Sequence, residues 1–163
     1  MLSGGGNRVV VLGGGMPGLC AGLAAAEAGA EVVVLESTAQ VGGSMRLSGG
    51  LVWGPRDLTT ARHYIPKGDK TLQALFVTEL PLAWAWLESL GLPLGPEIDC
   101  LKDDMGRGRM LDLGASGARG PFAEAMEHEL DRRGGSVERG AAVTSLRRPG
   151  ISSVAASLTG DAT

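Results

Sequence analysis

Three glycines in a G-x-G-x-x-G spacing, Gly13, Gly15 and Gly18, are the residues of this chain best suited to bind a phosphate group. Gly13 permits a tight turn, Gly15 lets the backbone approach a pyrophosphate without a Cβ in the way, and Gly18 allows close helix–strand packing. Pro17 fits the first turn of a helix, where its missing N–H costs nothing. The N-terminus of a helix favours an anion, so the motif predicts a nucleotide-binding turn.

An acidic residue stands at the distance that such a turn requires. Glu36 ends a valine-rich run after the glycines and can accept hydrogen bonds from both hydroxyls of an adenosine ribose. Ser37, the next residue, is predicted to belong to the same cofactor-binding site. The competing interpretation is a glycine turn with a surface glutamate. A Walker loop is excluded, because Leu19-Cys20 stands where that loop has Lys-Ser/Thr.

The flanking segments form a predicted strand–helix–strand unit. Arg8–Leu12 and Glu31–Glu36 are valine-rich and suit parallel strands buried on both faces. Leu19–Ala28 is predicted to be the helix between them, closed by Gly29. With Ser136–Glu138 as a third strand beside the second, we predict an α/β, Rossmann-like fold around a parallel sheet.

The rest of the chain is predicted more coarsely. The long segment Ser37–Pro66 reads as irregular, and Pro81 is expected to start a new helix after one that Asp69 caps. Inward positions are expected at Leu80, Ala83, Trp84 and Leu87, and at Phe122, Ala125, Met126 and Leu130. The further predicted elements are a helix over Lys70–Glu79, strands around Arg109–Leu113, a helix over Pro121–Arg133, and a β-ribbon of Ala142–Leu146 with Ile151–Leu158.

Two more glycine pairs favour FAD over NAD(P). Gly42-Gly43-Ser44 and Ser48-Gly49-Gly50 follow Glu36 closely and offer successive positions without side chains along a long ligand. The Ser44 hydroxyl could reach ribityl or phosphate oxygens. The strand–helix–strand unit alone does not choose between the two cofactors, so an NAD(P)-binding Rossmann protein stays open as an alternative.

Together these motifs resemble the N-terminal part of FAD-binding oxidoreductases related to fumarate reductase and succinate dehydrogenase flavoproteins. Leu51-Val52-Trp53-Gly54-Pro55 resembles the 3-ketosteroid 1-dehydrogenase branch. The resemblance implies FAD as cofactor and a dehydrogenation or reduction of a carbonyl-activated C–C bond. Its implied cofactor-binding residues are Gly13, Gly15, Pro17, Gly18, Glu36, Ser37, Gly42, Gly43, Ser44, Ser48, Gly49, Gly50, Ala142 and Val143, the last pair meeting the adenine through its backbone or else serving only as ribbon residues.

The resemblance also implies a substrate domain and catalytic residues for which this chain shows no matching motif. Members of the family are several times longer and carry a large substrate domain, which we expect to be absent from this chain. In the steroid branch the catalytic tyrosines lie mostly in those later parts, and in the fumarate branch the catalytic arginine and histidine residues lie in the substrate domain. No catalytic residue is therefore predicted in this chain. His63-Tyr64 is either an acid/base pair or an ordinary surface pair.

Composition narrows the class of protein. The net charge is −3 and no basic block exceeds two residues, which argues against nucleic acid as a partner. No apolar run is long enough for a membrane span. Two distant cysteines, Cys20 and Cys100, are expected to be free thiols, which suggests a reducing, cytoplasmic compartment and no metal site.

We therefore expect one N-terminal FAD-binding domain over residues 1–163. Its parts would be the nucleotide unit (8–36), a flavin-side loop with a helical insertion (37–120), and a helix, third strand and β-ribbon (121–163). One hypothesis is the FAD-binding part of an oxidoreductase that acts on a small molecule, a 3-ketosteroid being the specific candidate. Another is a truncated, inactive nucleotide-binding or interaction module. In either case an unpaired edge of Arg8–Leu12 is expected to favour self-association.

Overall fold

The computed structural model describes residues 7–100, 106–111, 121–147 and 155–158. The chain divides into two compact units, residues 1–47 with 120–163, and residues 48–119. The first unit contains the following elements: β1 (Arg8–Leu12), α1 (Met16–Glu27), β2 (Glu31–Glu36), a 3₁₀-helix η1 (Gly43–Leu47), α4 (Pro121–Arg132), β6 (Ser136–Arg139), β7 (Val143–Arg147) and β8 (Ala155–Leu158).

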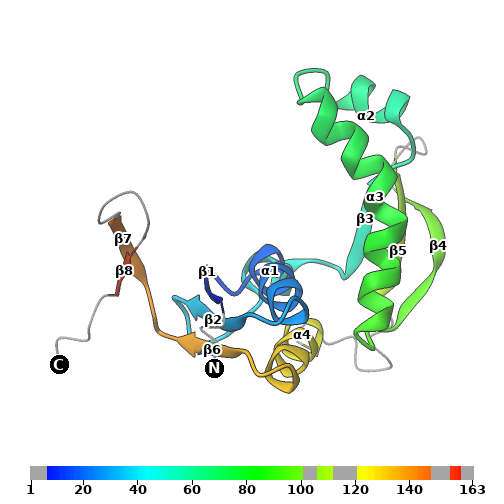
Figure 1. Cartoon of the computed structure of the whole chain (residues 1–163). Helices are drawn as coiled ribbons and strands as arrows, with labels where there is room; N and C mark the ends of the chain where they lie inside the picture. The colour runs from blue at the N-terminus through cyan, green and yellow to red at the C-terminus, as the bar shows by residue number, and fades with distance from the viewer. Residues whose placement is uncertain (1–6, 101–105, 112–120, 148–154, 159–163) are drawn as a thin grey trace, which may run out of the picture. The chain divides into compact units, whose positions relative to one another are not determined.

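A three-stranded parallel sheet is the frame of the first unit. Its order is β1-β2-β6, with Val10 opposite Val33 and Val34 opposite Val137. The predicted strands and the central position of the second are confirmed. Both crossovers run in the same direction along the sheet, so right-handed connections place α1 and α4 on one face. The two helices pack against each other there (Figure 1).

The two first strands differ in burial. Every residue of β2 after Glu31 is buried, as predicted. In β1, however, Val10 and Leu12 are 47% and 45% exposed, so the prediction of a strand buried on both faces is wrong for β1. Val11 contacts the α1 side at Gly18, and the alternation of a strand therefore turns Val10 and Leu12 to the other face. Among the described residues, β1 also pairs only with β2.

Helices α1 and α4 supply the rest of this core. Leu19 and Leu23 of α1 and Met126 and Leu130 of α4 are fully buried. Ala123 is buried in place of Ala125, which is exposed, so that part of the predicted inward stripe is wrong. The apolar face of α4 is rotated toward position 123, where Ala123 lies against Gly42.

The second unit is an antiparallel sheet packed on a long helix. Strand order is β3-β5-β4. Its elements are β3 (Leu51–Pro55), α2 (Leu58–Tyr64), α3 (Lys70–Ser89), β4 (Leu94–Cys100) and β5 (Gly106–Leu111). The prediction of an irregular Ser37–Pro66 is thus wrong for β3 and α2. The predicted strand near 109–113 is present as β5, with positions 112 and 113 outside the described residues.

Pro81 does not end a helix, contrary to prediction: α3 runs through it. Asp69 caps α3 as expected, accepting hydrogen bonds from the N–H groups of Thr71 and Leu72. Leu80, Trp84 and Leu87 are buried beside the proline, whereas Ala83 is exposed. The Trp84 indole also donates to the Val52 carbonyl at 3.1 Å. This packing outweighs the one helical hydrogen bond that proline cannot make.

The β-ribbon is present as predicted where the structure describes it. Strands β7 and β8 pair antiparallel, with Leu146 opposite Ala156. Residues 151–154 of the expected second strand lie outside the described residues. None of the described helices has the length and apolar composition needed to cross a membrane.

Candidate functional site

The glycine turn between β1 and α1 has the geometry that its spacing predicts. Gly13 has φ +94°, and its N–H donates to the Leu35 carbonyl at 2.8 Å, which fixes the turn to β2. A Cβ on Gly18 would lie 1.8 Å from the Gly13 carbonyl oxygen, so only glycine allows α1 to start this close to β1. A Cβ on Gly22 would meet Val34 at 3.2 Å, which continues the close approach one turn later.

Gly15 has the opposite surroundings. A Cβ placed there would meet nothing nearer than the Gly42 carbonyl oxygen at 4.0 Å. Its φ of −75° suits any residue, so packing and backbone conformation do not explain the glycine. A ligand lying close to the backbone would explain it. The space above Gly15 therefore has room for a ligand.

The first turn of α1 offers donors to such a ligand. Gly15 precedes the helix without a side-chain cap, and Pro17 lies in the first turn as predicted. The first bond within the helix runs from the Leu19 N–H to the Gly15 carbonyl. The N–H groups of Met16 and Gly18 precede it and have no partner among the described residues. These N–H groups and the helix dipole can hold an anion.

Glu36 stands beside this turn and is 6% exposed. Its Oε2 accepts a hydrogen bond from the Gly14 N–H at 2.7 Å. Its Oε1 accepts from the Thr38 N–H and hydroxyl, both at 2.8 Å, and from the Ser37 hydroxyl at 3.3 Å. Because a carboxylate oxygen accepts about two hydrogen bonds, Oε2 is the atom with remaining capacity for a ligand hydroxyl.

The charge of Glu36 is secured by its partners. Burial raises the pKa of its carboxyl, but the hydrogen bonds from Thr38, Gly14 and Ser37 together lower that pKa below its ordinary value. Glu36 is therefore an anionic acceptor at neutral pH. This arrangement excludes the alternative of a surface glutamate.

The structure brings the first later glycine pair to the same place. The Gly42 N–H donates to the Gly14 carbonyl at 2.7 Å, and Gly15 and Gly42 form an isolated parallel bridge. A Cβ on Gly43 would lie 3.6 Å from the Gly15 Cα. Ser44 follows on η1 and is exposed. Gly42, Gly43 and Ser44 thus join Gly13–Gly18 and Glu36 in one cluster, which we name the glycine cradle.

The remaining predicted positions divide between the two units. The Ala141 N–H donates to the Glu36 carbonyl at 2.9 Å, which leads Ala142 and Val143 past the end of β2. Ser48, Gly49 and Gly50 belong to the second unit. Gly50 has φ +83°, and its carbonyl accepts a hydrogen bond from the Leu111 N–H. The structure gives no relation between these three residues and the cradle.

Sequence reasoning missed three residues that shape the cradle or support it. Gly14 and Thr38 hold the Glu36 carboxylate, and Val41, 2% exposed, packs against Gly14. Thr38 had a signal, because a hydroxyl residue two positions after an acid often bonds locally to it. Gly14 had none, since its role depends on a contact between residues 22 positions apart.

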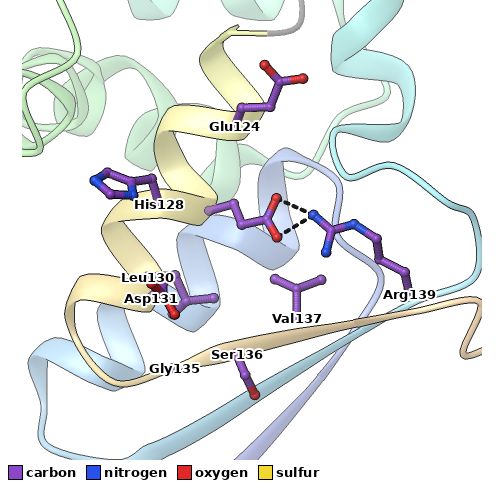
Figure 2. A pocket seen from close by; sticks show the side chains of 9 residues that line it. Glu124, His128, Leu130, Asp131, Gly135, Ser136, Val137 and Arg139 are labelled. Atoms are coloured by element: carbon purple, nitrogen blue, oxygen red, sulfur yellow. Dashed lines mark hydrogen bonds and ion pairs between the residues drawn. The ribbon is translucent and has the colours of Figure 1, made fainter.

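Hollows among the described residues of the first unit include the following two. One, of about 370 Å³, is lined by Thr38, Ala39, Gln40, Gly43 and Arg46 and therefore adjoins the cradle. The other, of about 490 Å³, lies between α4 and β6 and includes no cradle residue. Figure 2 shows this second hollow, where the Glu127 carboxylate pairs with Arg139 through two hydrogen bonds.

His63 and Tyr64 lie on α2, and both are exposed. Their rings meet edge to face with centroids 4.7 Å apart. Tyr64 also borders an apolar cavity of about 110 Å³ with Trp53, Ile65 and Phe76. The exposure of both side chains is that of an ordinary surface pair.

A comparison with known protein families matches most of this chain to one family. Residues 8–144 match the family described as "FAD binding domain". The chain belongs to this FAD-binding family. FAD is therefore its cofactor, and the expected flavoprotein relationship is confirmed. Open space at Gly15, unpartnered N–H groups at α1 and the anionic Glu36 fit the pyrophosphate and ribose of FAD.

Solved structures support the fold. A flavocytochrome c3 fumarate reductase matches with a TM-score of 0.81 and 23% identity over 94% of this chain and 30% of that chain. A 3-ketosteroid-Δ4-(5α)-dehydrogenase from Rhodococcus jostii RHA1, solved with 4-androstene-3,17-dione, matches with a TM-score of 0.71 and 19% identity over 99% of this chain and 44% of that one. At these identities the likeness shows the fold alone.

Curated relatives match over a shorter stretch. An L-amino-acid oxidase of Crotalus adamanteus and apoxin-1, an L-amino-acid oxidase of Crotalus atrox, are each 38% identical over 92 residues. That stretch is 52% of this chain and 18% of either relative. The chain thus spans less than a fifth of these relatives' length.

Proposed function

We propose that the glycine cradle is the FAD site of an oxidoreductase and that it binds the adenosine and pyrophosphate part of the cofactor. The observation that carries this assignment is the meeting of the α1 N-terminus and the Glu36 carboxylate at Gly14 and Gly15. Gly13 and Gly18 shape the turn, Gly15 admits the pyrophosphate, and Pro17 holds the first helical turn. Glu36 binds the ribose through Oε2, with Ser37 beside it.

The other predicted residues extend this site along the ligand. Gly42, Gly43 and Ser44 flank the phosphates and the ribityl chain, supported by the contacts of Gly42 and Gly43 with Gly14 and Gly15. Ala142 and Val143 meet the adenine through their backbone, because Ala141 is bonded to the end of β2. Ser48, Gly49 and Gly50 line the flavin ring in this proposal, on the strength of the sequence resemblance alone.

The reaction proposed is dehydrogenation or reduction of a carbonyl-activated C–C bond. Bound FAD would supply the hydride acceptor or donor. The part of the cradle is to hold the cofactor by its non-reacting end. A 3-ketosteroid is the specific substrate proposed, and it rests on the resemblance of Leu51–Pro55 to that branch.

A second function is a nucleotide-binding or interaction module without turnover. It is supported by the edge of β1 that no described strand covers. The open edge of β1 would let such a module self-associate.

Dye-linked 1,2-dehydrogenation of a 3-ketosteroid, measured together with FAD binding, tests the proposed function. We expect the 163-residue chain, saturated with FAD, to show no turnover above free FAD, because the cradle residues hold the cofactor by its non-reacting end. Flavin fluorescence in the same samples should report binding. Turnover above free FAD would contradict this expectation and place a catalytic group within the chain. Absent FAD binding would contradict the proposed site.

A further inference from the structure

We propose that Arg46 binds the FAD pyrophosphate and that Glu124 of α4, which contacts Arg46, competes with the cofactor for this guanidinium. The inference rests on the proposed placement of FAD at the cradle. Arg46 would add a positively charged side chain to a phosphate position otherwise formed by backbone N–H groups. Glu124 would be a residue that opposes cofactor binding.

The position of Arg46 brings its side chain to the cradle. Arg46 lies on η1, which begins at Gly43 beside Gly15. Its stem covers Gly42, where an added Cβ would lie 2.7 Å from the Arg46 Cγ. Gly42 is itself bridged to Gly15. The guanidinium is therefore carried on the segment that borders the proposed phosphate position.

The contacts of Arg46 leave most of its donors for a ligand. Nη1 donates to the Val41 carbonyl and to the Glu124 carboxylate, both at the long distance of 3.4 Å. Nε and Nη2 have no partner among the described residues. A guanidinium presents five N–H donors in a planar fork that suits phosphate oxygens. The side chain is 28% exposed, which keeps it within reach of a bound anion.

The charges around the cradle favour the transfer of Arg46 from Glu124 to a bound pyrophosphate. Glu36 and Glu124 contribute two negative charges near the cradle, and the first turn of α1 carries no acidic side chain. A pyrophosphate adds further negative charge beside Glu36, which Arg46 can offset. Glu124 is 59% exposed, so water can solvate it once Arg46 has moved. An exposed ion pair of this kind is weak and is readily exchanged for a phosphate contact.

The structure provides room for this movement. The hollow of about 370 Å³ is bordered by Arg46 and Gly43 and by Thr38–Gln40. Glu124 lies in the first turn of α4 (Figure 2), and Arg139 is bonded to both carboxylate oxygens of Glu127. Releasing Arg46 from Glu124 therefore leaves that neighbouring pair intact.

Equilibrium titrations with FAD, ADP and adenosine test the proposal. We expect Arg46→Ala to weaken FAD and ADP about tenfold or more, the effect of losing a charge-assisted phosphate contact. Adenosine, which has no phosphate, should bind the variant and the wild type equally. Arg46→Lys should fall between them, because it keeps the charge and loses the fork.

Glu124→Gln gives the opposite sign. It should tighten FAD binding about threefold, since it removes the competing carboxylate. In the Arg46→Ala background, Glu124→Gln should leave FAD affinity unchanged, because the guanidinium for which Glu124 competes is then absent. Arg132→Ala, which removes an exposed arginine from the last turn of α4, is the matched control and should leave FAD affinity unchanged.

Two results would overturn the inference while leaving the FAD site in place. One is wild-type FAD affinity in Arg46→Ala. The other is weaker FAD binding in Glu124→Gln, which would make the ion pair a structural brace. Circular dichroism of each variant confirms folding. A wild-type chain that binds neither FAD nor ADP would instead refute the proposed site, and the inference with it.

Discussion

Glu36 uses its two carboxylate oxygens differently, and this division decides what a substitution does. Oε1 is bonded within its own turn by Ser37 and Thr38, whereas Oε2 faces Gly14 and the proposed ribose. We predict that Glu36→Ala weakens FAD binding by about 1.5–3 kcal/mol, the size of a hydrogen bond to a charged group. Glu36→Arg should be worse, because arginine offers no acceptor.

Fluorescence titration with FAD and FMN measures this effect. FMN carries the flavin without the adenosine ribose, so its affinity should not change in Glu36→Ala. An equal loss for FAD and FMN would show that the substitution disturbs the fold rather than a ribose contact.

Protonation of Glu36 should also be visible in stability. Its folded-state pKa lies below the ordinary value of 4.5, so its contribution to the free energy of unfolding is complete above that value and is lost as the pH falls through the folded-state pKa. We predict that wild type exceeds Glu36→Gln by a constant margin from about pH 8 to pH 5.5 and that the margin shrinks below about pH 4.5. Urea unfolding across this range measures the margin, and a margin that grows on acidification would be the contrary result.

Among the elements, the strand–turn–helix unit could be predicted from sequence because its residue types are set by contacts and dihedral angles within a short stretch of chain. Gly18 is required by a backbone contact and Gly13 by a positive φ, so spacing alone located them. Strand β3 and the unbroken α3 could not be predicted in the same way. Their placement depends on residues distant in sequence, such as Trp84, which bonds to Val52 across 32 positions.

The open edge of β1 is the element with the clearest consequence. The bonds from Glu31 N–H to Asn7 carbonyl and from Gly13 N–H to Leu35 carbonyl turn the odd-numbered residues of this segment toward β2. The backbone groups of Arg8, Val10 and Leu12 therefore face the edge that no described strand covers. Such an apolar edge favours pairing with another chain.

We predict that the wild-type chain self-associates and that Val10→Lys, in the middle of this edge, shifts it toward monomer. Sedimentation velocity over a concentration series measures the shift. Leu82→Lys is the matched control, because Leu82 is an exposed leucine of α3 in the other unit. Equal association of both variants would exclude the β1 edge as the contact.

For the molecule as a whole, the sequence predicted the residues of the proposed cofactor cradle and no residue of a reacting end. Glu36 and Gly15 could be predicted because the nucleotide unit is continuous in sequence and lies within one unit. Ser48–Gly50 lie in the second unit, so their place along the cofactor depends on how the units meet. The chain also spans 44% of the ketosteroid dehydrogenase that it matches in fold, so the substrate side is assigned by proposal alone.

The central claim is that the cradle binds FAD through an unobstructed Gly15, and titration of wild type and Gly15→Ala with FAD and NAD⁺ tests it most directly. An alanine at Gly15 fits the fold, since its Cβ has no neighbour nearer than 4.0 Å, but it occupies the proposed pyrophosphate position. We predict that wild type binds FAD at least about tenfold more tightly than NAD⁺, and that Gly15→Ala loses about tenfold in FAD affinity with an unchanged melting temperature. Tight NAD⁺ binding without FAD binding, or full FAD affinity in Gly15→Ala, would contradict the claim.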